Sequence, residues 1–308
     1  MAQSQTVPTP IQLERSHPLD ATTNFYRYLF LLPALLTLVA VIIFPLLYTI
    51  RISFSGWNVA NASLNFIGFD NYANVLQDKR FWESLATLAL TAITSVALEF
   101  VIGLGLALLL WQEGKGGRFF RVLFLLPMMV TPVIMSVVWQ TIFHESLGPV
   151  NDLLQRVGLP PVLWLTEYPQ AFFSVIIAEV WQWTPFVFIL LLAGLKALPH
   201  EPFEAASVDG ASVLQTFWHI TFQLLRPFIA SVLLIRSIEA SKIMETVYVL
   251  TSGGPGTSTE TTSYYIFIAG LRDFKIGYAA SLSIVYLLLM TIALTLIAKW
   301  LTRGIQTL

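Results

Sequence analysis

The chain lacks cysteine and has little charge. Its 308 residues contain 17 lysines and arginines against 18 aspartates and glutamates, so charged residues make up 11% and the formal net charge is −1. The absence of cysteine excludes disulfides, thiolate metal sites and cysteine nucleophiles. The balanced charge gives no field that would attract nucleic acid or acidic ligands. With 56% hydrophobic residues and a mean hydropathy of +0.72, the composition also argues against a soluble globule.

Several motifs of enzymes are missing as well. The chain has no G-x-x-x-x-G-K-[ST] phosphate loop, because EGKGGR at 113–118 lacks that spacing. The histidines lie far apart and show no metal-ligand spacing, which argues against a metal site and an integral-membrane enzyme. These histidines are His17, His144, His200 and His219. We therefore expect no bond chemistry, no metal and no cofactor in this chain.

Long hydrophobic runs dominate the sequence instead. A helix needs about 20 apolar residues to span a bilayer, because its backbone amides must be satisfied within the segment. Uncharged runs of this kind cover 28–50, 122–143 and 276–298. Similar runs with ionisable residues inside cover 84–111 with Glu99, 168–195 with Glu179, and 227–250. The sequence predicts an all-α integral membrane protein with six transmembrane helices.

The first run raises the question of a signal peptide. It is too long for a signal h-region and no A-x-A-like site follows, which favours a retained helix. Residues 1–27 and 300–308 are then expected to be cytoplasmic tails, the first one flexible. With the N-terminus in the cytoplasm, inward segments hold more lysine and arginine than outward ones. Residues 51–83, 144–167 and 251–275 then face outward.

The longest inward loop, 196–226, is polar and patterned as helix. Glutamates and alanines before Gly210 favour a first helix, and a second can begin near Ser212. Two short helices should therefore meet at a glycine bend, with Pro227 stopping the second. An interfacial helix on lipid headgroups is an alternative. Residues 201–220 carry three acidic side chains and no lysine or arginine, which favours a protein partner.

The same loop resembles the EAA loop of binding-protein-dependent ABC importer permeases. The residues that carry this resemblance are Glu204, Ala205, Ala206, Asp209 and Gly210. Segments 181–199, 247–267 and 277–283 resemble the carbohydrate-uptake branch, which includes maltose-type and glycerol-phosphate-type permeases. The resemblance covers nearly the whole chain after the tail. One departure is Gln223, where the family usually has a proline.

The resemblance implies a type I ABC importer fold, with an ABC type-1 transmembrane domain at 84–299 after the first helix at 28–50. The chain would be a multi-pass protein of a prokaryotic inner membrane. It would form half of the translocation path for a sugar or a related polyol or glycoside. Its implied partners are a second homologous permease subunit, an extracytoplasmic solute-binding protein, and two cytoplasmic ATPase subunits that hold ATP and Mg. Membrane lipid would surround it.

The resemblance also makes the inward loop a coupling helix that docks in a groove of an ATPase subunit. The residues expected in this coupling are Glu204, Ala205, Ala206, Asp209 and Gly210. An ion-gradient-driven secondary transporter remains the alternative from another class. Such a protein would be expected to show inverted repeats or unwound helix pairs near the midplane, and neither is visible in the sequence.

Ionisable and aromatic residues inside the spans are candidates for the translocation path. Each ionisable residue near a bilayer centre costs about 2.5–3.5 kcal/mol, so these residues should face protein or water. They could bind sugar hydroxyls or stack on a sugar ring, or they could pair and pack structurally. The candidates are Arg236, Glu239 and Lys242, spaced every three residues with Glu245, and Glu179, Gln182 and Trp183 on one helix face. Glu99 is expected to pair or to line the pore.

Overall fold

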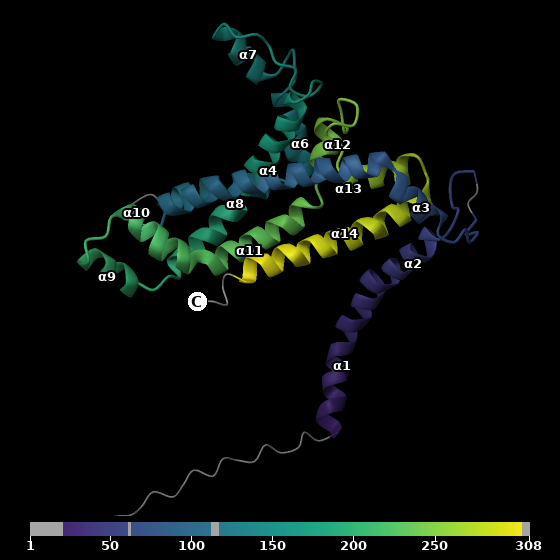
Figure 1. Ribbon diagram of the computed structural model, residues 1–308, viewed down its shortest axis with the longest axis horizontal. Coiled ribbons are helices and arrows are strands. Elements are labelled where there is room, and N and C mark those ends of the chain that lie inside the picture. The colour runs from purple at the N-terminus through teal and green to yellow at the C-terminus, as the bar shows by residue number, and fades with distance from the viewer. Residues whose placement is uncertain (1–20, 61–62, 112–116, 304–308) are drawn as a thin grey trace, which may run out of the picture. The chain divides into compact units, whose positions relative to one another are not determined.

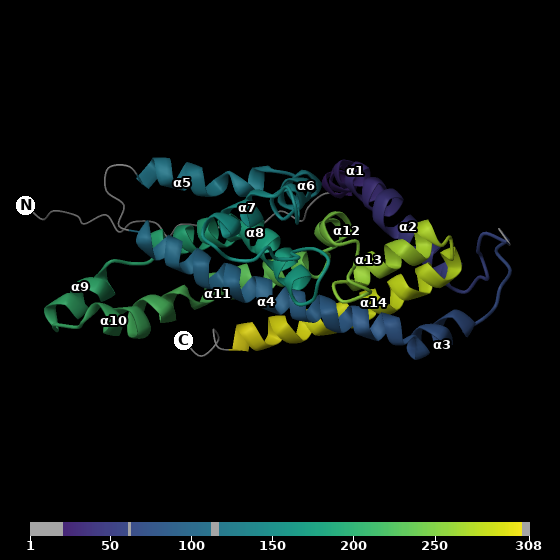
Figure 2. The same cartoon turned by 90° about the horizontal axis from the view of Figure 1, so that it is seen from above.

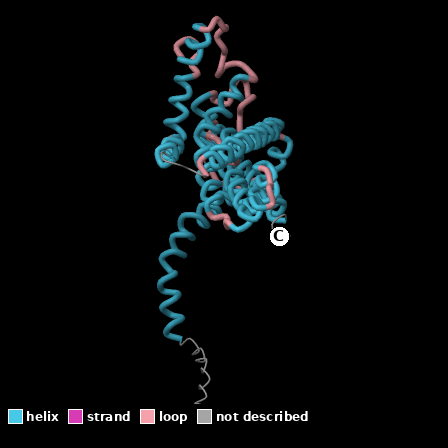
Figure 3. The backbone as a smooth tube through the Cα atoms, turned by 90° about the vertical axis from the view of Figure 1, so that its left-hand side faces the viewer, coloured by secondary structure: helices cyan, strands magenta, loops and turns pink. Residues whose placement is uncertain are grey.

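The computed structural model describes residues 21–60, 63–111 and 117–303, and the chain divides into two compact units, Met1–Arg51 and Ile52–Leu308. Every regular element in the described part is a helix (Figure 3), which confirms the all-α prediction. Of the predicted tails, residues 1–20 and 304–308 lie outside the described residues. The helices extend further than expected, because they begin at Ala21 and end at Arg303.

The first unit is a long apolar helix. Its pieces are α1 (Ala21–Leu38), a π-helical turn η1 (Val39–Ile43) and α2 (Phe44–Ser53), whose last two residues belong to the second unit. The run Leu29–Ser53 is long and apolar enough to cross a membrane, and none of its side chains up to Arg51 is buried. A helix that is apolar on every side requires lipid or another protein around it.

Long helices packed side by side form the body of the second unit (Figure 1; Figure 2). They are α4 (Lys79–Leu109), α8 (Gln170–Lys196), α11 (Phe222–Ala240) and α14 (Ile276–Arg303). The largest interface joins α4 to α8, and α11 packs on both. Between them lies a cluster of fully buried apolar side chains that includes Ala107, Phe188, Leu191, Leu225 and Val232. Burial of this apolar surface holds the three helices together.

Asp78 fixes the start of α4 and ties it to distant parts of the chain. Its Oδ1 accepts hydrogen bonds from the backbone N–H groups of Arg80 and Phe81, as an N-cap does. Its Oδ2 accepts hydrogen bonds from the Tyr265 and Tyr278 hydroxyls, each at 2.5 Å. Burial raises the pKa of the carboxyl, but the hydrogen bonds outweigh this effect and hold the pKa below its usual range.

Shorter helices lie at the two ends of this bundle. At one end are α9 (Glu201–Val208) and α10 (Val213–Thr216), and at the other are α3 (Asp70–Gln77) and α13 (Thr262–Phe267), followed by η4 (Ile268–Arg272) (Figure 1; Figure 2). The predicted inward loop 196–226 thus lies at the opposite end from the predicted outward segments 51–83 and 251–275, whereas α7 of the predicted outward loop 144–167 projects from the side of the bundle (Figure 1).

The predicted span over 122–143 is not one continuous helix. It is divided into α5 (Gly117–Leu125), a 3-10 turn η2 (Pro127–Met129) and α6 (Pro132–Ile142), and the short helix α7 (Pro149–Arg156) follows. Pro127 and Pro132 have no backbone N–H, and the residues before Pro132 are extended. By length and composition, five described helices could cross a membrane, and this interrupted segment is not among them.

The fifth predicted span begins earlier than expected. Residues Val213–Ala240 form one apolar helix of 28 residues, made of α10, a π-helical turn η3 (Phe217–Thr221) and α11. Pro227 therefore lies inside this helix, and the prediction that it stops a short helix is wrong. The side chains of Thr221 and Gln223 donate hydrogen bonds to carbonyl groups five residues before them, across this wider turn. The predicted inward loop, 196–226, and the fifth span thus share one continuous helix.

The same span also ends earlier than expected, because α11 stops at Ala240 and a turn precedes α12 (Glu245–Leu250). Carbonyl groups in this turn are satisfied by side chains from distant segments. The carbonyl of Ser241 accepts a hydrogen bond from the Tyr286 hydroxyl, and that of Ile243 accepts one from Thr261 at 2.7 Å. These bonds replace the helical ones that a continuous span over 227–250 would have made.

Gly103 sets the distance between α4 and α8, and this yields a test of the packing. A methyl group on Gly103 would lie 2.8 Å from a Val187 side-chain carbon and 3.1 Å from the Phe188 backbone nitrogen, whereas one on Gly105 would meet nothing within 4 Å. We expect Gly103→Ala to destabilise the bundle by about 1–3 kcal/mol through overpacking. Gly105→Ala should leave stability unchanged or raise it by up to about 1 kcal/mol through helix propensity.

Thermal unfolding of the two purified variants in detergent, followed by tryptophan fluorescence, measures both effects. Equal midpoints for Gly103→Ala and Gly105→Ala would contradict the close contact between α4 and α8.

Candidate functional site

The loop that was predicted to face inward, 196–226, contains a helical hairpin, which we name the coupling hairpin after its predicted role and define as α9, the bend at Gly210 and α10. Gly210 has a φ of +73°, a conformation that residues with a Cβ rarely adopt. The backbone N–H of Ala211 bonds the carbonyl of Ala206 at 2.9 Å, which closes α9. Ser212 and Gln215 form a capping box that opens α10. The predicted pair of helices meeting at a glycine is therefore confirmed.

The tip of the coupling hairpin is exposed and mixes acidic with apolar side chains. Of the predicted coupling residues, Ala206 is buried, while Glu204, Ala205, Asp209 and Gly210 are exposed. Val208 and Val213 are 88% and 90% exposed. Such apolar groups beside carboxylates suit the surface of a protein partner, whereas anionic lipid headgroups would favour lysine and arginine.

A groove of about 1110 Å³ runs between the coupling hairpin and the end of α4. Its walls are mainly apolar and aromatic, and Gly210 lies in its lining. The side chains of Trp111 and Phe203 meet edge to face across it, with ring centroids 5.3 Å apart. The other lining residues include Leu108, Leu109, Leu214 and Phe217. The coupling hairpin is thus held against α4 by a small aromatic contact.

A buried ion pair joins α4 to α11 in the middle of the bundle. The Arg236 Nε and Nη2 atoms donate hydrogen bonds to the two oxygens of the Glu99 carboxylate, at 2.6 and 2.8 Å. Both side chains are fully buried. The Trp183 ring of α8 covers the guanidinium, with 4.6 Å between the Arg236 Cζ atom and the ring centroid. Three helices therefore meet at one guanidinium group.

Two further polar side chains lie on α8 within about one turn of Trp183. Glu179 is buried and accepts a hydrogen bond from the Thr246 hydroxyl of α12. Gln182 is also buried, and its amide donates to the Val130 carbonyl at the break between α5 and α6, at 2.8 Å. The polar face predicted on this span therefore points into the protein. It connects α8 to α11, to α12 and to the interrupted segment.

The predicted series of charges on the fifth span is split by the end of α11. Glu239 and Lys242 pair at 2.9 Å, and both side chains reach the surface. Arg236 pairs with Glu99 on α4 instead of Glu239 on its own helix, and Glu245 begins α12. Among the described residues of this series, Glu239 and Lys242 form the one i, i+3 ion pair, and it crosses the end of α11 at Ala240.

The burial of these groups decides what a solute could touch. Among the path candidates, Trp183, Glu239 and Lys242 reach the surface, whereas Arg236, Glu179 and Gln182 are buried. The geometry does not test whether any of them contacts solute, so the path assignment stays a prediction. The sequence analysis did not identify Arg236 as the partner of Glu99. Two opposite charges on separate apolar spans would have indicated that they could pair.

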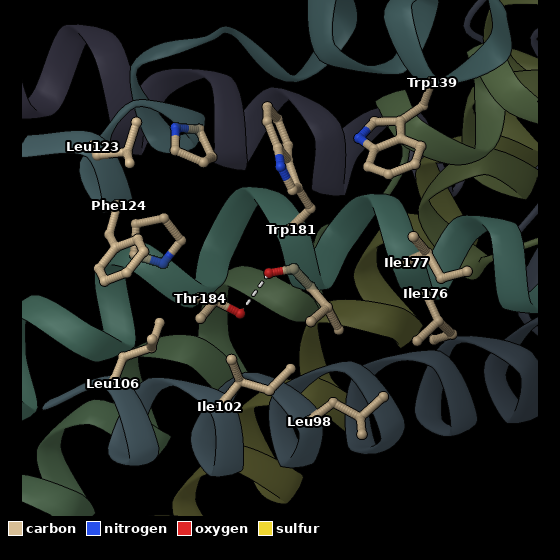
Figure 4. A pocket seen from close by; sticks show the side chains of 13 residues that line it. Leu98, Ile102, Leu106, Leu123, Phe124, Trp139, Ile176, Ile177, Trp181 and Thr184 are labelled. Carbon is tan, nitrogen blue, oxygen red and sulfur yellow. Dashed lines mark hydrogen bonds between the residues drawn. The ribbon is translucent and has the colours of Figure 1, made fainter. Parts of the chain in front are cut away.

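A second cavity, of about 590 Å³, lies between α4, α8 and the interrupted segment α5–α6. Its walls are almost wholly apolar, and the Thr184 hydroxyl that faces it already bonds the Val180 carbonyl at 2.6 Å (Figure 4). The Trp139 and Trp181 rings lie 5.9 Å apart at one side. None of the predicted path residues lines this cavity. It is suited to an apolar occupant and not to a charged or hydroxyl-rich one.

Known proteins resemble this chain over most of its length. Residues 99–307 match the model of a family described as binding-protein-dependent transport system inner membrane component. The chain is 38% identical to the trehalose/maltose transport system permease protein MalF of Thermococcus litoralis over 256 residues. This aligned region covers 83% of this chain and 87% of the relative. It is 32% identical over 268 residues to the sulfoquinovosyl glycerol transport system permease protein SmoG of Agrobacterium fabrum, 87% of each chain.

A solved structure has the same fold. A crystal structure of a bacterial ABC transporter involved in the import of the acidic polysaccharide alginate superimposes with a TM-score of 0.81. The two chains are 24% identical, and the match covers 92% of this chain and 96% of that chain.

The buried pair can be tested through its contribution to stability. Glu99→Leu leaves the Arg236 guanidinium buried without a counter-charge, and we expect a loss of about 3–5 kcal/mol. The double variant Glu99→Leu/Arg236→Met removes both charges and should recover most of that loss. Glu83→Gln, which breaks an exposed pair with Lys79 on the same helix, should cost at most about 1 kcal/mol.

Thermal unfolding in detergent compares these variants. A double variant that is less stable than Glu99→Leu alone would contradict the pairing.

Proposed function

The chain belongs to the family of binding-protein-dependent transport system inner membrane components, and we propose that it imports a carbohydrate with energy from a separate ATPase. Its fold is that of ABC importer permeases, as the sequence predicts. The chain is a membrane permease subunit, and its apolar helices fit a multi-pass protein of the inner membrane. We place its N-terminus in the cytoplasm.

The coupling hairpin supports the energy source in this proposal. Its two helices meet at Gly210, and its exposed tip carries apolar groups next to Glu204 and Asp209. A cytoplasmic protein with a complementary groove would cover this surface. We propose that this protein is the ATPase subunit, which holds ATP and Mg, and that this chain hydrolyses nothing itself. An ion-gradient-driven transporter would have no need for such a docking surface.

The names of the relatives support the proposed class of solute. They name trehalose, maltose and sulfoquinovosyl glycerol as transported compounds. We propose a sugar or a related polyol or glycoside as the solute of this chain. Such solutes are bound by hydrogen bonds and by stacking on aromatic rings. Among the path candidates, Trp183, Glu239 and Lys242 reach the surface and could supply both kinds of contact.

The proposed assembly contains four kinds of component. This chain would form half of the translocation path, and a second, homologous permease subunit would form the other half. Two ATPase subunits would bind the cytoplasmic side, and a solute-binding protein would deliver solute from outside. The family description, which names a binding-protein-dependent system, supports the last of these.

Uptake by the assembled complex tests the proposal directly. In proteoliposomes with the binding protein outside and ATP inside, we expect uptake of at least one labelled di- or monosaccharide, polyol or glycoside from a panel. Uptake should stop without ATP and should persist when ionophores collapse ion gradients. Uptake that follows an imposed ion gradient and ignores ATP would contradict the proposal.

The coupling hairpin yields a second test. Gly210→Val places a β-branched side chain at positive φ, which costs about 1–2 kcal/mol or more and should deform the bend. We expect reduced co-purification of the ATPase and at least a tenfold loss of uptake, with normal membrane insertion. Gly158→Val is the matched control, because Gly158 also has a positive φ, of 79°, and open space around it.

Co-purification with the tagged ATPase and uptake are measured for both variants. Equal ATPase association for Gly210→Val, Gly158→Val and the unmodified chain would contradict the docking role of the hairpin. Charge reversal by Glu204→Lys should weaken the association as well.

A further inference from the structure

Where α4, α8 and α11 meet, the described residues include one buried cation, Arg236, and two buried carboxylates, Glu99 and Glu179. Arg236 is fully paired with Glu99 of α4, while Glu179 of α8 is buried nearby with Thr246 as its hydrogen-bond donor. Arg236, Glu99 and Glu245 all lie near enough to Glu179 to act on it electrostatically. A buried carboxylate without a cation of its own is costly in a low-dielectric interior. The two carboxylates therefore compete for one guanidinium.

The helix geometry places the second carboxylate within reach of that guanidinium. Trp183, whose ring covers Arg236 at 4.6 Å, lies four residues after Glu179 on α8. Residues at i and i+4 share one face of a helix and lie about 5–6 Å apart. Glu179 and Trp183 thus present the same face of α8 to Arg236. A short movement of α11 along this face would bring Arg236 from Glu99 towards Glu179.

The same helix connects Arg236 to the coupling hairpin at its other end. Val213–Ala240 is one continuous helix, and Arg236 lies 23 residues after Val213, about 35 Å along the helix axis. A displacement of the coupling hairpin along this axis would therefore also displace Arg236. The contacts between α11 and its neighbours include Leu225, Ile229 and Val232, which are apolar. Apolar contacts have no preferred direction, whereas a bidentate ion pair is either formed or broken.

We propose that Arg236 is a two-position switch in transport, bonded to Glu99 of α4 in the conformation described here and to Glu179 of α8 in the alternate conformation. Thr246 holds Glu179 while Arg236 is bonded to Glu99, and it releases Glu179 when α11 moves. Discrete pairing of this kind gives the helix two positions instead of a continuous range. Glu99, Glu179 and Thr246 are positioning residues and do not contact solute in this role. The proposal rests on the chain working as an ATPase-driven permease subunit.

Variants at the two carboxylates should shift the switch in opposite directions. Glu179→Gln removes the second partner and holds Arg236 on Glu99, so uptake and solute-stimulated ATP hydrolysis should fall at least tenfold. Thr246→Val frees Glu179 with little change of shape, so ATP hydrolysis without solute should rise several-fold. Glu99→Gln should act like Thr246→Val. Glu179→Asp keeps a carboxylate and should recover part of the uptake lost in Glu179→Gln.

The experiment uses the complete importer in proteoliposomes and measures uptake, ATP hydrolysis with and without solute, and the amount of assembled complex. Glu83→Gln, which removes an exposed charge from the outer part of α4, is the matched control and should keep the normal ratio of ATP hydrolysed to solute imported. Opposite effects of Glu179→Gln and Thr246→Val at normal assembly support the switch.

Three results would overturn the switch. ATP hydrolysis could change in the same direction in Glu179→Gln and Thr246→Val, the ratio of ATP hydrolysed to solute imported could stay normal in both variants, or the losses could follow the amount of assembled complex. If the unmodified importer hydrolyses ATP but imports no carbohydrate, the proposed solute class fails. The effects on hydrolysis without solute still decide the switch in that case.

Discussion

The arrangement of the bundle depends on one guanidinium that is buried between membrane-spanning helices. An ionised group at that depth must be paired, since removal of its partner leaves an uncompensated charge that costs several kcal/mol. Arg236 meets this requirement through both oxygens of Glu99 and through the Trp183 ring. Three helices are therefore held in a defined register at this point, in addition to the apolar packing between them.

The position of Arg236 on its helix connects the buried pair to the coupling hairpin. The helix that carries Arg236 begins at Val213, directly after the capping box at Ser212. Within this helix the π-helical turn and Pro227 are accommodated without a break. In the switch proposed above, a push on the coupling hairpin would reach the buried pair through this one helix. The proposed mechanism needs such a connection between the proposed docking surface and the buried pair.

Local features of this fold could be predicted from the sequence, and contacts between distant segments could not. Turn chemistry at Gly210 and the helix formers before it correctly predicted the coupling hairpin. The prolines that interrupt 122–143 were visible, but the length of the apolar run outweighed them. The partner of Glu99 lies on another helix, and the end of α11 is set by hydrogen bonds from Thr261 and Tyr286. Periodicity along one segment carries no information on such partners.

Structure determination of the assembled importer in its nucleotide-free and ATP-trapped states tests this account most directly. We predict an unbroken helix over Val213–Ala240 in both states, with the Arg236 guanidinium bonded to Glu99 in one state and to Glu179 in the other. The account would be contradicted if the coupling hairpin moved between the two states while the pair of Arg236 and Glu99 kept the same geometry.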